Sequence, residues 1–364
     1  MYLSSAPARV CLFGEHQDYL FQKVIPAAIN LRLNIVSEKN KDKNLKITSI
    51  NLNETIIIPP NIEELSSPVG SFKAFIEAGV ISLKQAFTDI EIPAINSTIS
   101  SYIPLASGLS SSAALLVGWI SHLSGILEMG LDKRDIAELA YNAEHRVMNI
   151  PCGKMDQYST SYGSIISLSC IEPPELTKLR KHDFELVIVN SNTPKLTSEV
   201  HGSKVHDVKR VVNKLERLAN TELKHLSSED FVKYDKQFPS REICMLKAIL
   251  SIKEDTEKAE TLLQSAKPDI QMLGELLSSQ QNALRDGIKV SLPILDKIVK
   301  TGIEEGALGG KLTGAGLGGC VVFLVREDGL GIMERLKSKL ELPTWFVEID
   351  QGVYFEKNYF SLSQ

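Results

Sequence analysis

The chain has 364 residues, 43% of them hydrophobic, which is enough to bury a large core and predicts two domains. Its net charge is −5 with acidic and basic residues interleaved, which excludes the basic surface that nucleic-acid binding requires. We expect neither a signal peptide nor a membrane span, because the N-terminus lacks a basic-then-apolar segment and polar residues interrupt the apolar run at 113–127. The five cysteines form no Cys-x-x-Cys pair, which favours buried free thiols in a reducing cytoplasm over a metal site.

Hydrophobic periodicity predicts mixed strands and helices. In the first half we expect strands at 7–13, 24–36, 45–50, 54–58, 93–100, 164–170 and 184–190, and helices at 71–87, 110–128 and 133–148. From about 203 the pattern is helical and then mixed, with helices at 204–219, 239–252, 268–285, 291–304 and 329–340, and strands at 320–325 and 344–348. Because strands and helices do not alternate strictly, the fold class is predicted as α+β.

A glycine turn followed by three serines precedes an apolar, alanine-rich helix. The segment contains Gly108, Leu109, Ser110, Ser111 and Ser112. Backbone N–H groups at a helix start lack intrahelical acceptors and lie at the positive end of the dipole, so this turn can bind a phosphate. The serine hydroxyls can also reach a nucleotide-bound Mg²⁺. The alternative is one N-cap serine followed by surface serines, which explains three consecutive hydroxyls poorly.

A second glycine-rich segment, 309–319, precedes the apolar strand at 320–325. It contains Gly314, Ala315 and Gly316, and its glycines allow the backbone to approach a ligand closely. Neither this segment nor the serine-rich one has the spacing of a Walker loop or a dinucleotide-binding fingerprint. Two anion-binding loops predict one polyphosphate held between them.

The N-terminal strand ends in a polar cluster. Gly14 is followed by Glu15, His16 and Asp18, which is typical of a recognition site at the end of a buried strand. From the residues alone, a solvated turn explains this cluster equally well.

Together and in this order, the three segments resemble the motifs of the GHMP kinase superfamily, and within it the galactokinases. Arg9 and residues 14–19 match the pattern Arg-x-x-x-x-Gly-Glu-His-x-Asp-Tyr, and residues 143–146 and 151–157 are also similar to galactokinase. The resemblance implies an N-terminal domain at 1–180 and a C-terminal domain at 181–364, with the nucleotide and sugar site between them. It also implies ATP-dependent phosphorylation of a monosaccharide at its anomeric hydroxyl, with galactose as the default acceptor.

The resemblance assigns roles to most of these residues. Both glycine-containing loops would bind ATP, at 108–112 and 314–316. Mg²⁺ would be held by Ser112, with Ser111 as the alternative, together with Glu144. Glu144 could instead pair with Arg146 or Lys154.

The resemblance also names the catalytic and sugar-binding groups. Asp156 would accept the proton of the attacking hydroxyl, and Arg9 would orient that hydroxyl and offset charge on the γ-phosphate. Without the resemblance, a turn residue and a surface ion pair explain these two residues as well. The sugar would be bound by Glu15, His16, Asp18, Gly153 and Asp156. Phe72 and Phe75 could hold the adenine, or belong to the core.

Two departures from galactokinases concern the acceptor. Leu20-Phe21-Gln22 replaces the family's Asn-Gly-Gly turn, and no tyrosine lies between Tyr162 and Tyr234, where Val200 is nearest to a sugar-contacting Tyr of the family. Arabinose, N-acetylgalactosamine, a uronic acid and mevalonate therefore stay open as acceptors. A non-catalytic sugar sensor is the alternative of another class, and the uninterrupted serine loop favours an enzyme over it. The sequence does not indicate an oligomeric state.

Overall fold

Two β-sheets form the framework of the protein, seen in a computed structural model that describes residues 1–193 and 198–358. The first sheet contains β1 Tyr2–Phe13, β2 Lys23–Lys39, β3 Leu45–Ser49, β4 Glu54–Ile58, β5 Ile95–Ser101, β6 Ile166–Ser169, β7 Glu175–Lys178 and β12 Tyr354–Lys357. Its main path runs β12-β1-β2-β5-β3-β4, and β6 joins through β2. The second sheet, β11-β8-β10-β9, contains β8 Glu185–Asn190, β9 Gly309–Thr313, β10 Cys320–Val325 and β11 Thr344–Val347.

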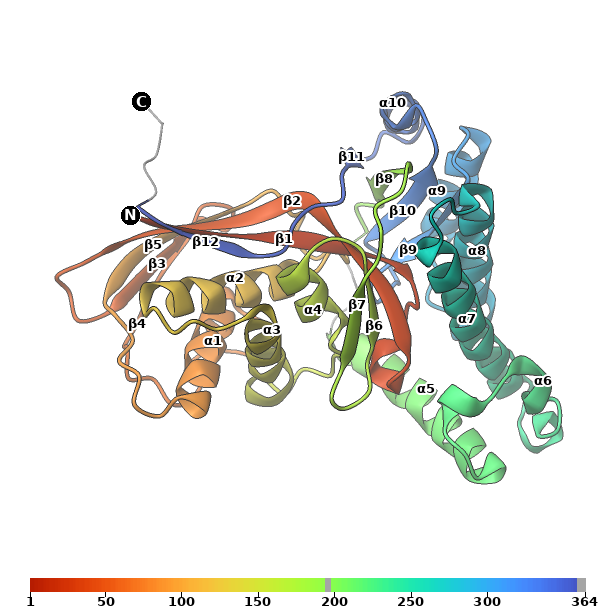
Figure 1. Ribbon diagram of the computed structural model, residues 1–364, viewed down its shortest axis with the longest axis horizontal. Helices are drawn as coiled ribbons and strands as arrows, with labels where there is room; N and C mark the ends of the chain where they lie inside the picture. The colour runs from red at the N-terminus through yellow and green to blue at the C-terminus, as the bar shows by residue number, and fades with distance from the viewer. Residues whose placement is uncertain (194–197, 359–364) are drawn as a thin grey trace.

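Four helices cover one face of the first sheet (Figure 1). They are α1 Phe72–Ala86, α2 Ser111–Ile126, α3 Lys133–Tyr141 and α4 Met155–Tyr162. Small residues let α2 lie close to β1, because a Cβ on Gly118 would contact the Cβ of Ala6 at 3.3 Å. α3 begins with a capping box at Asp132. It passes into a π-helical turn at Asn142–Val147, so the helix expected at 133–148 has two geometries.

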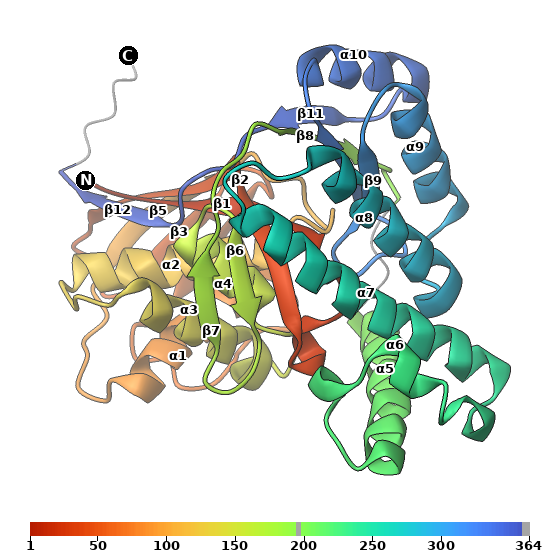
Figure 2. The same ribbon diagram turned by 45° about the vertical axis from the view of Figure 1, so that its right-hand side comes forward.

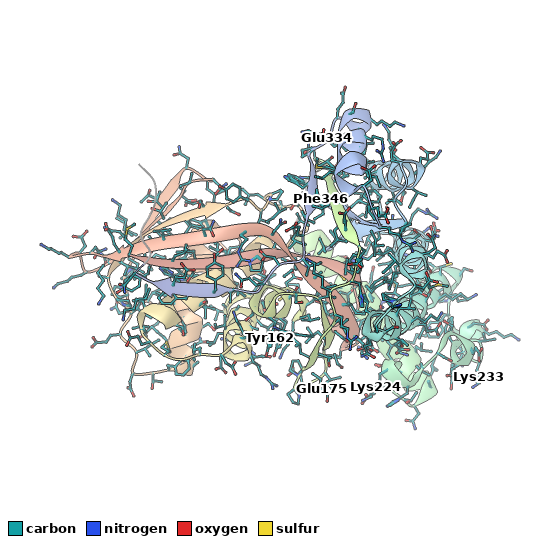
Figure 3. The ribbon with its side chains drawn as sticks, turned by 45° about the horizontal axis from the view of Figure 1, so that its top comes forward. Tyr162, Glu175, Lys224, Lys233, Glu334 and Phe346 are labelled. Carbon is teal, nitrogen blue, oxygen red and sulfur yellow. The ribbon has the colours of Figure 1, made fainter. Side chains whose placement is uncertain are left out.

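The remaining helices follow β8 in the chain. They are α5 Ser198–Ala219, α6 Ser228–Phe231, α7 Ser240–Gln264, α8 Ile270–Ala283, α9 Pro293–Glu304 and α10 Gly329–Leu340. Among them, α8, α9 and α10 contact the second sheet. Side chains of α5, α6, α7, α9 and α10 form a second core with this sheet, whereas the buried apolar side chains of α8 belong to the core of the first sheet. Figure 2 shows α8 and α9 beside β9, which both contact, and α7 next to α8. In Figure 3, Lys224 and Lys233 lie in the region around α6, while Glu334 on α10 and Phe346 on β11 lie near the opposite end.

The last strand returns to the first sheet. β12 pairs with β1 in antiparallel register, with Tyr2 opposite Lys357 (Figure 1). The domain boundary near 180 stays a prediction. The division is not strictly sequential, because β12, which follows the second sheet in the chain, belongs to the first sheet. The predicted α+β class is confirmed. Within the described residues, no helix combines the length and apolarity needed to cross a bilayer.

Candidate active site

The two glycine-containing loops lie against each other where the two sheets meet. Gly108 has φ +80°, and a Cβ there would collide with the carbonyl oxygen of Thr313. Gly314 has φ +85°, and its Cβ would lie 2.8 Å from the carbonyl oxygen of Gly108. The Cys320 N–H also donates to the Ser107 carbonyl at 2.9 Å. Glycine is required at both loops because each backbone approaches the other closely.

The serine-rich segment does begin a helix, but its first serine is not a cap. α2 begins at Ser111, and Ser110 occupies the N-cap position with φ 60° and no side-chain cap bond. The Ser110 hydroxyl instead donates to Oδ2 of Asp156. Ser110 therefore takes the N-cap position without capping the helix through its hydroxyl, which the alternative of an N-cap serine required. The hydroxyl of Ser110 stabilises the carboxylate on α4 and not the backbone of α2.

Arg9 and Asp156 form a bidentate ion pair. Nε and Nη2 of Arg9 donate to the two carboxylate oxygens of Asp156 at 2.7 and 2.8 Å, and Nη1 donates to the Gly108 carbonyl at 2.6 Å. The Arg9 side chain is only 4% exposed, which rules out a surface ion pair. Burial alone would lower the pKa of Arg9, but the charges of Asp156 and Glu15 outweigh it and raise that pKa. The pair thus joins β1, the serine loop and α4.

A cavity of about 130 Å³ lies next to this ion pair. Ten residues predicted for the site line it: Arg9, Glu15, His16, Asp18, Ser112, Glu144, Gly153, Asp156, Gly314 and Ala315. Tyr19, Cys152 and Gln157 line it as well.

The other predicted phosphate-binding residues have different surroundings. Leu109 is buried in the core, and its carbonyl accepts from the Arg9 N–H at 3.3 Å. Gly316 has φ +73° and packs against the carbonyl of Val290. Packing thus accounts for the apolar side chain of Leu109 and for the glycine at 316. Only the backbone of these two residues could contact a phosphate.

Three side chains of the first motif face the cavity in different electrostatic settings. Glu15 Oε2 accepts from Lys311 Nζ at 2.7 Å. His16 Nδ1 and the Tyr19 hydroxyl are hydrogen-bonded at 2.8 Å. Burial, and next the negative charge of Asp156, raise the pKa of Asp18 to about 7.

Gly153 leaves room for a neighbouring carboxylate. A Cβ at Gly153 would collide with the carboxylate of Asp18. The absent side chain therefore makes room for Asp18. This brings the two predicted sugar-binding segments into direct contact.

The candidate metal ligands offer hard oxygen donors. Ser112 at the start of α2 and Glu144 in the π-helical turn both line the cavity. Glu144 Oε2 accepts from Gln157 Nε2 at 2.7 Å. Lys154 pairs with Glu138 at 2.8 Å and Glu172 at 3.0 Å, so the alternative of a Glu144–Lys154 pair is wrong. A hydroxyl and a carboxylate fit Mg²⁺, which takes few protein oxygens. Among residues 1–193 and 198–358, no group of three or more His, Cys, Asp or Glu forms a metal cluster.

Several other residues considered from the sequence do not line the cavity. Phe72 is buried and Phe75 packs against the same core, and neither lines the cavity, so the structure favours the core interpretation. In the altered turn, Phe21 has φ 59° and is exposed, while Leu20 is buried in the second core. Val200 belongs to residues 194–201, whose side chains lie outside the described part of the chain. Cys244 is exposed, contrary to the expectation of buried thiols.

Sequence reasoning missed the residues that join the two halves beside the site. Thr313 Oγ1 accepts from the Cys11 N–H at 2.9 Å, and Gln280 Oε1 accepts from the Gly14 N–H at 3.1 Å. Lys311 on β9 likewise reaches Glu15. These residues carry no local signal, because their partners are distant in sequence. Gln157, which binds Glu144 within the N-terminal half, was also not predicted as a site residue.

Three family models match the chain. The GHMP kinases N terminal domain matches residues 74–164, the GHMP kinases C terminal domain matches 259–341, and the galactokinase galactose-binding signature matches 2–39. These three stretches contain the serine loop, the glycine-rich loop and the polar cluster after β1.

Relatives of known name agree with these matches. A galactokinase of Staphylococcus saprophyticus is 29% identical over 92% of this chain and 88% of its own length. A galactokinase of Lactococcus lactis is 27% identical over 91% of this chain and 84% of its own length.

Solved structures share the fold. Lactococcus lactis galactokinase, crystallised with galactose, superposes with a TM-score of 0.86 at 24% identity and covers 97% of this chain and 94% of its own. Methanococcus jannaschii mevalonate kinase gives 0.74 at 22% identity, covering 96% of this chain and 98% of its own. The resemblance predicted from the motifs is confirmed: the chain belongs to the GHMP kinases and carries the galactose-binding signature of galactokinases.

Proposed function

We propose that the protein transfers the γ-phosphoryl group of ATP to the anomeric hydroxyl of galactose, giving galactose 1-phosphate. The observation that carries this proposal is the single cavity that unites the polar cluster after β1, the Arg9–Asp156 pair and the glycine-containing loops. The galactose-binding signature and the named galactokinases support galactose as the acceptor. The protein is accordingly a sugar kinase.

Phosphoryl transfer is catalysed mainly by positioning and by charge. Asp156 lines the cavity, and its carboxylate would accept a hydrogen bond from the attacking hydroxyl. Arg9 holds that carboxylate with two N–H groups, which fixes its orientation and places positive charge beside the transferring group. Ser110 adds a third donor to Asp156. Because three donors already engage the Asp156 carboxylate, one acceptor site is left for the attacking hydroxyl, and orientation of this hydroxyl contributes more here than proton abstraction.

ATP and Mg²⁺ are assigned to the other side of the cavity. The backbone of the serine loop and of 314–316 would hold the phosphates. The serine loop leads into the start of α2, where N–H groups lack intrahelical acceptors, and Gly314 and Ala315 line the same cavity. Ser112 and Glu144 would hold the cation, which supplies positive charge to the β- and γ-phosphates when bound. Gln157 orients Glu144 through its side-chain amide.

Removing either cation ligand is expected to raise the Mg²⁺ concentration needed for activity. Ser112→Ala and Glu144→Gln should each raise the half-maximal Mg²⁺ concentration roughly 10-fold or more, because one ligand of a largely hydrated cation is lost. Rates of ADP release measured against Mg²⁺ at saturating sugar would show it. Asp255→Asn, which removes a carboxylate of α7 outside the cavity, is the matched control. An unchanged Mg²⁺ requirement in both site variants would remove these two assignments and leave the kinase proposal standing.

The missing tyrosine predicts a relaxed acceptor site. A sugar-contacting Tyr offers a ring edge and a hydroxyl, and its replacement by a smaller residue is worth about 1–3 kcal/mol of discrimination. We therefore expect phosphorylation of galactose together with measurable activity on a relative such as a 2-substituted galactose or a pentose.

Initial rates of ADP release across a panel of monosaccharides, mevalonate and homoserine test the acceptor and the relaxed site together. Activity on galactose alone would contradict the relaxed site. Activity on mevalonate or homoserine without any on sugars would overturn the acceptor. Sugar binding by calorimetry without ADP release would indicate a sensor.

A further inference from the structure

Lys311 is a buried cation from the second sheet that reaches a residue of the first motif. It lies on β9, and its side chain is fully buried. Its Nζ donates to Glu15 Oε2 at 2.7 Å and to the Leu312 carbonyl at 2.9 Å. Lys311 and Glu15 are 296 positions apart in the chain. Because β9 continues directly into the loop at 314–316, one short segment serves both the glycine-rich loop and the carboxylate after β1.

Glu15 needs this cation. Its side chain is only 2% exposed, and an ionised carboxylate at such a position is costly unless it is paired and hydrogen-bonded. Asp18 and Asp156 line the same cavity and add negative charge, and Arg9 is occupied by Asp156 and Gly108. Arg9 attracts Glu15 from farther away, and within the described part of the chain Lys311 is the cation that pairs directly with it.

The two carboxylate oxygens of Glu15 have different surroundings. Lys311 engages Oε2, which leaves Oε1 as the acceptor for a substrate hydroxyl in the cavity that Glu15 lines. A lysine that also donates to a backbone carbonyl has little rotational freedom. The carboxylate is thereby held in one orientation before the substrate arrives, which lowers the ordering cost of binding.

Resting on the proposed function, we propose that Lys311 is a positioning residue for the sugar. It fixes Glu15 so that one carboxylate oxygen accepts a particular hydroxyl of galactose, and in this way the strand that carries the glycine-rich loop takes part in sugar selection. Lys311 touches neither substrate, since it lies behind Glu15 and does not line the cavity.

The test compares Lys311→Met, Lys311→Arg, Glu15→Gln and the double variant Lys311→Met with Glu15→Gln. Steady-state kinetics would use galactose and its 2-, 3-, 4- and 6-deoxy derivatives. Lys311→Met should raise the KM for galactose roughly 10- to 100-fold, as for loss of a hydrogen bond to a charged group, with the KM for ATP changed little. Lys311→Arg should keep the KM for galactose close to that of the wild type. The double variant should have the same KM for galactose as Glu15→Gln, because Lys311 acts through Glu15.

The deoxy sugars identify the hydroxyl concerned. The deoxygalactose that lacks the hydroxyl bound by Glu15 should be a poor substrate of the wild type. Its KM should be nearly the same in the wild type, Lys311→Met and Glu15→Gln, because the affected contact is already absent. Lys23→Met is the matched control, since Lys23 forms another lysine–glutamate pair between the halves, with Glu260 on α7. It should leave the KM for galactose unchanged.

Three results would overturn the proposal: an unchanged KM for galactose in folded Lys311→Met, equal rises in the KM of galactose and ATP, or a double variant much worse than Glu15→Gln. If Lys311→Met does not fold, the double variant still decides, because its buried charges are removed together. A wild type that does not phosphorylate galactose would instead contradict the proposed function.

Discussion

Asp156→Asn is expected to lower kcat for galactose roughly 100- to 1,000-fold, with the KM for galactose and ATP changed little. Removal of one group that stabilises and orients only the reacting centre has an effect of this size. Arg9→Lys should lose a similar factor, because a lysine cannot hold both oxygens of Asp156 with two parallel N–H groups. Steady-state ADP release gives kcat, and calorimetric titration of galactose shows whether binding persists.

A second arginine–aspartate pair provides the control for this experiment. Arg32 Nη1 and Asp350 Oδ2 lie 2.7 Å apart, and neither residue lines the cavity. Asp350→Asn should affect stability at most, and leave kcat unchanged. Near-normal kcat in Asp156→Asn or in Arg9→Lys would show that the residue concerned is structural.

Asp18→Asn is expected to stabilise the folded protein above pH 7 while weakening sugar binding. The pKa of Asp18 is raised from 3.8 to about 7, so between these values the native state holds a proton that the unfolded state has lost. The wild type therefore loses stability as pH rises from about 4 to 7, by on the order of 4 kcal/mol, and the asparagine variant escapes this loss. Unfolding midpoints of both proteins from pH 4 to 8.5 would measure the difference.

The stability gain should become small near pH 4, close to the ordinary pKa of 3.8, and vanish at lower pH, where Asp18 is protonated in both states. Asp42→Asn, which changes an exposed aspartate, should match the wild type at every pH. At neutral pH, Asp18→Asn should also raise the KM for galactose, since a hydroxyl acceptor beside Glu15 is altered. A stability difference that does not depend on pH would contradict the raised pKa.

Much of the fold could be predicted from hydrophobic periodicity. The long apolar strands and the helices with strong apolar stripes lie close to where they were expected. The missed elements are short or polar: α4 contains mostly polar residues, β9 begins with two glycines, and β12 is four residues long. Such segments become regular through tertiary pairing, which a local pattern does not contain.

The site was predictable as a set of residues but not as a set of partners. The motifs named ten residues that line one cavity. They could not indicate that Ser110 donates to Asp156, that Gly153 makes room for Asp18, or that Lys311 compensates Glu15. Each of these relations joins segments distant in the chain, and burial decides which oppositely charged groups must meet.

The return of β12 to β1 sets an order on folding during synthesis. One edge of β1 is covered by β2, but the other edge of residues 2–5 has no strand partner until residues 354–357 have been made. The ring of Phe355 then stacks on Tyr2 at a centroid distance of 6.0 Å and fills the space above Gly125 on α2. Until then the nascent chain presents an open strand edge, which is a template for aggregation. A chain interrupted before β12 thus exposes a strand edge that the complete sheet covers. Chaperones and proteases can detect this difference between the interrupted and the complete chain.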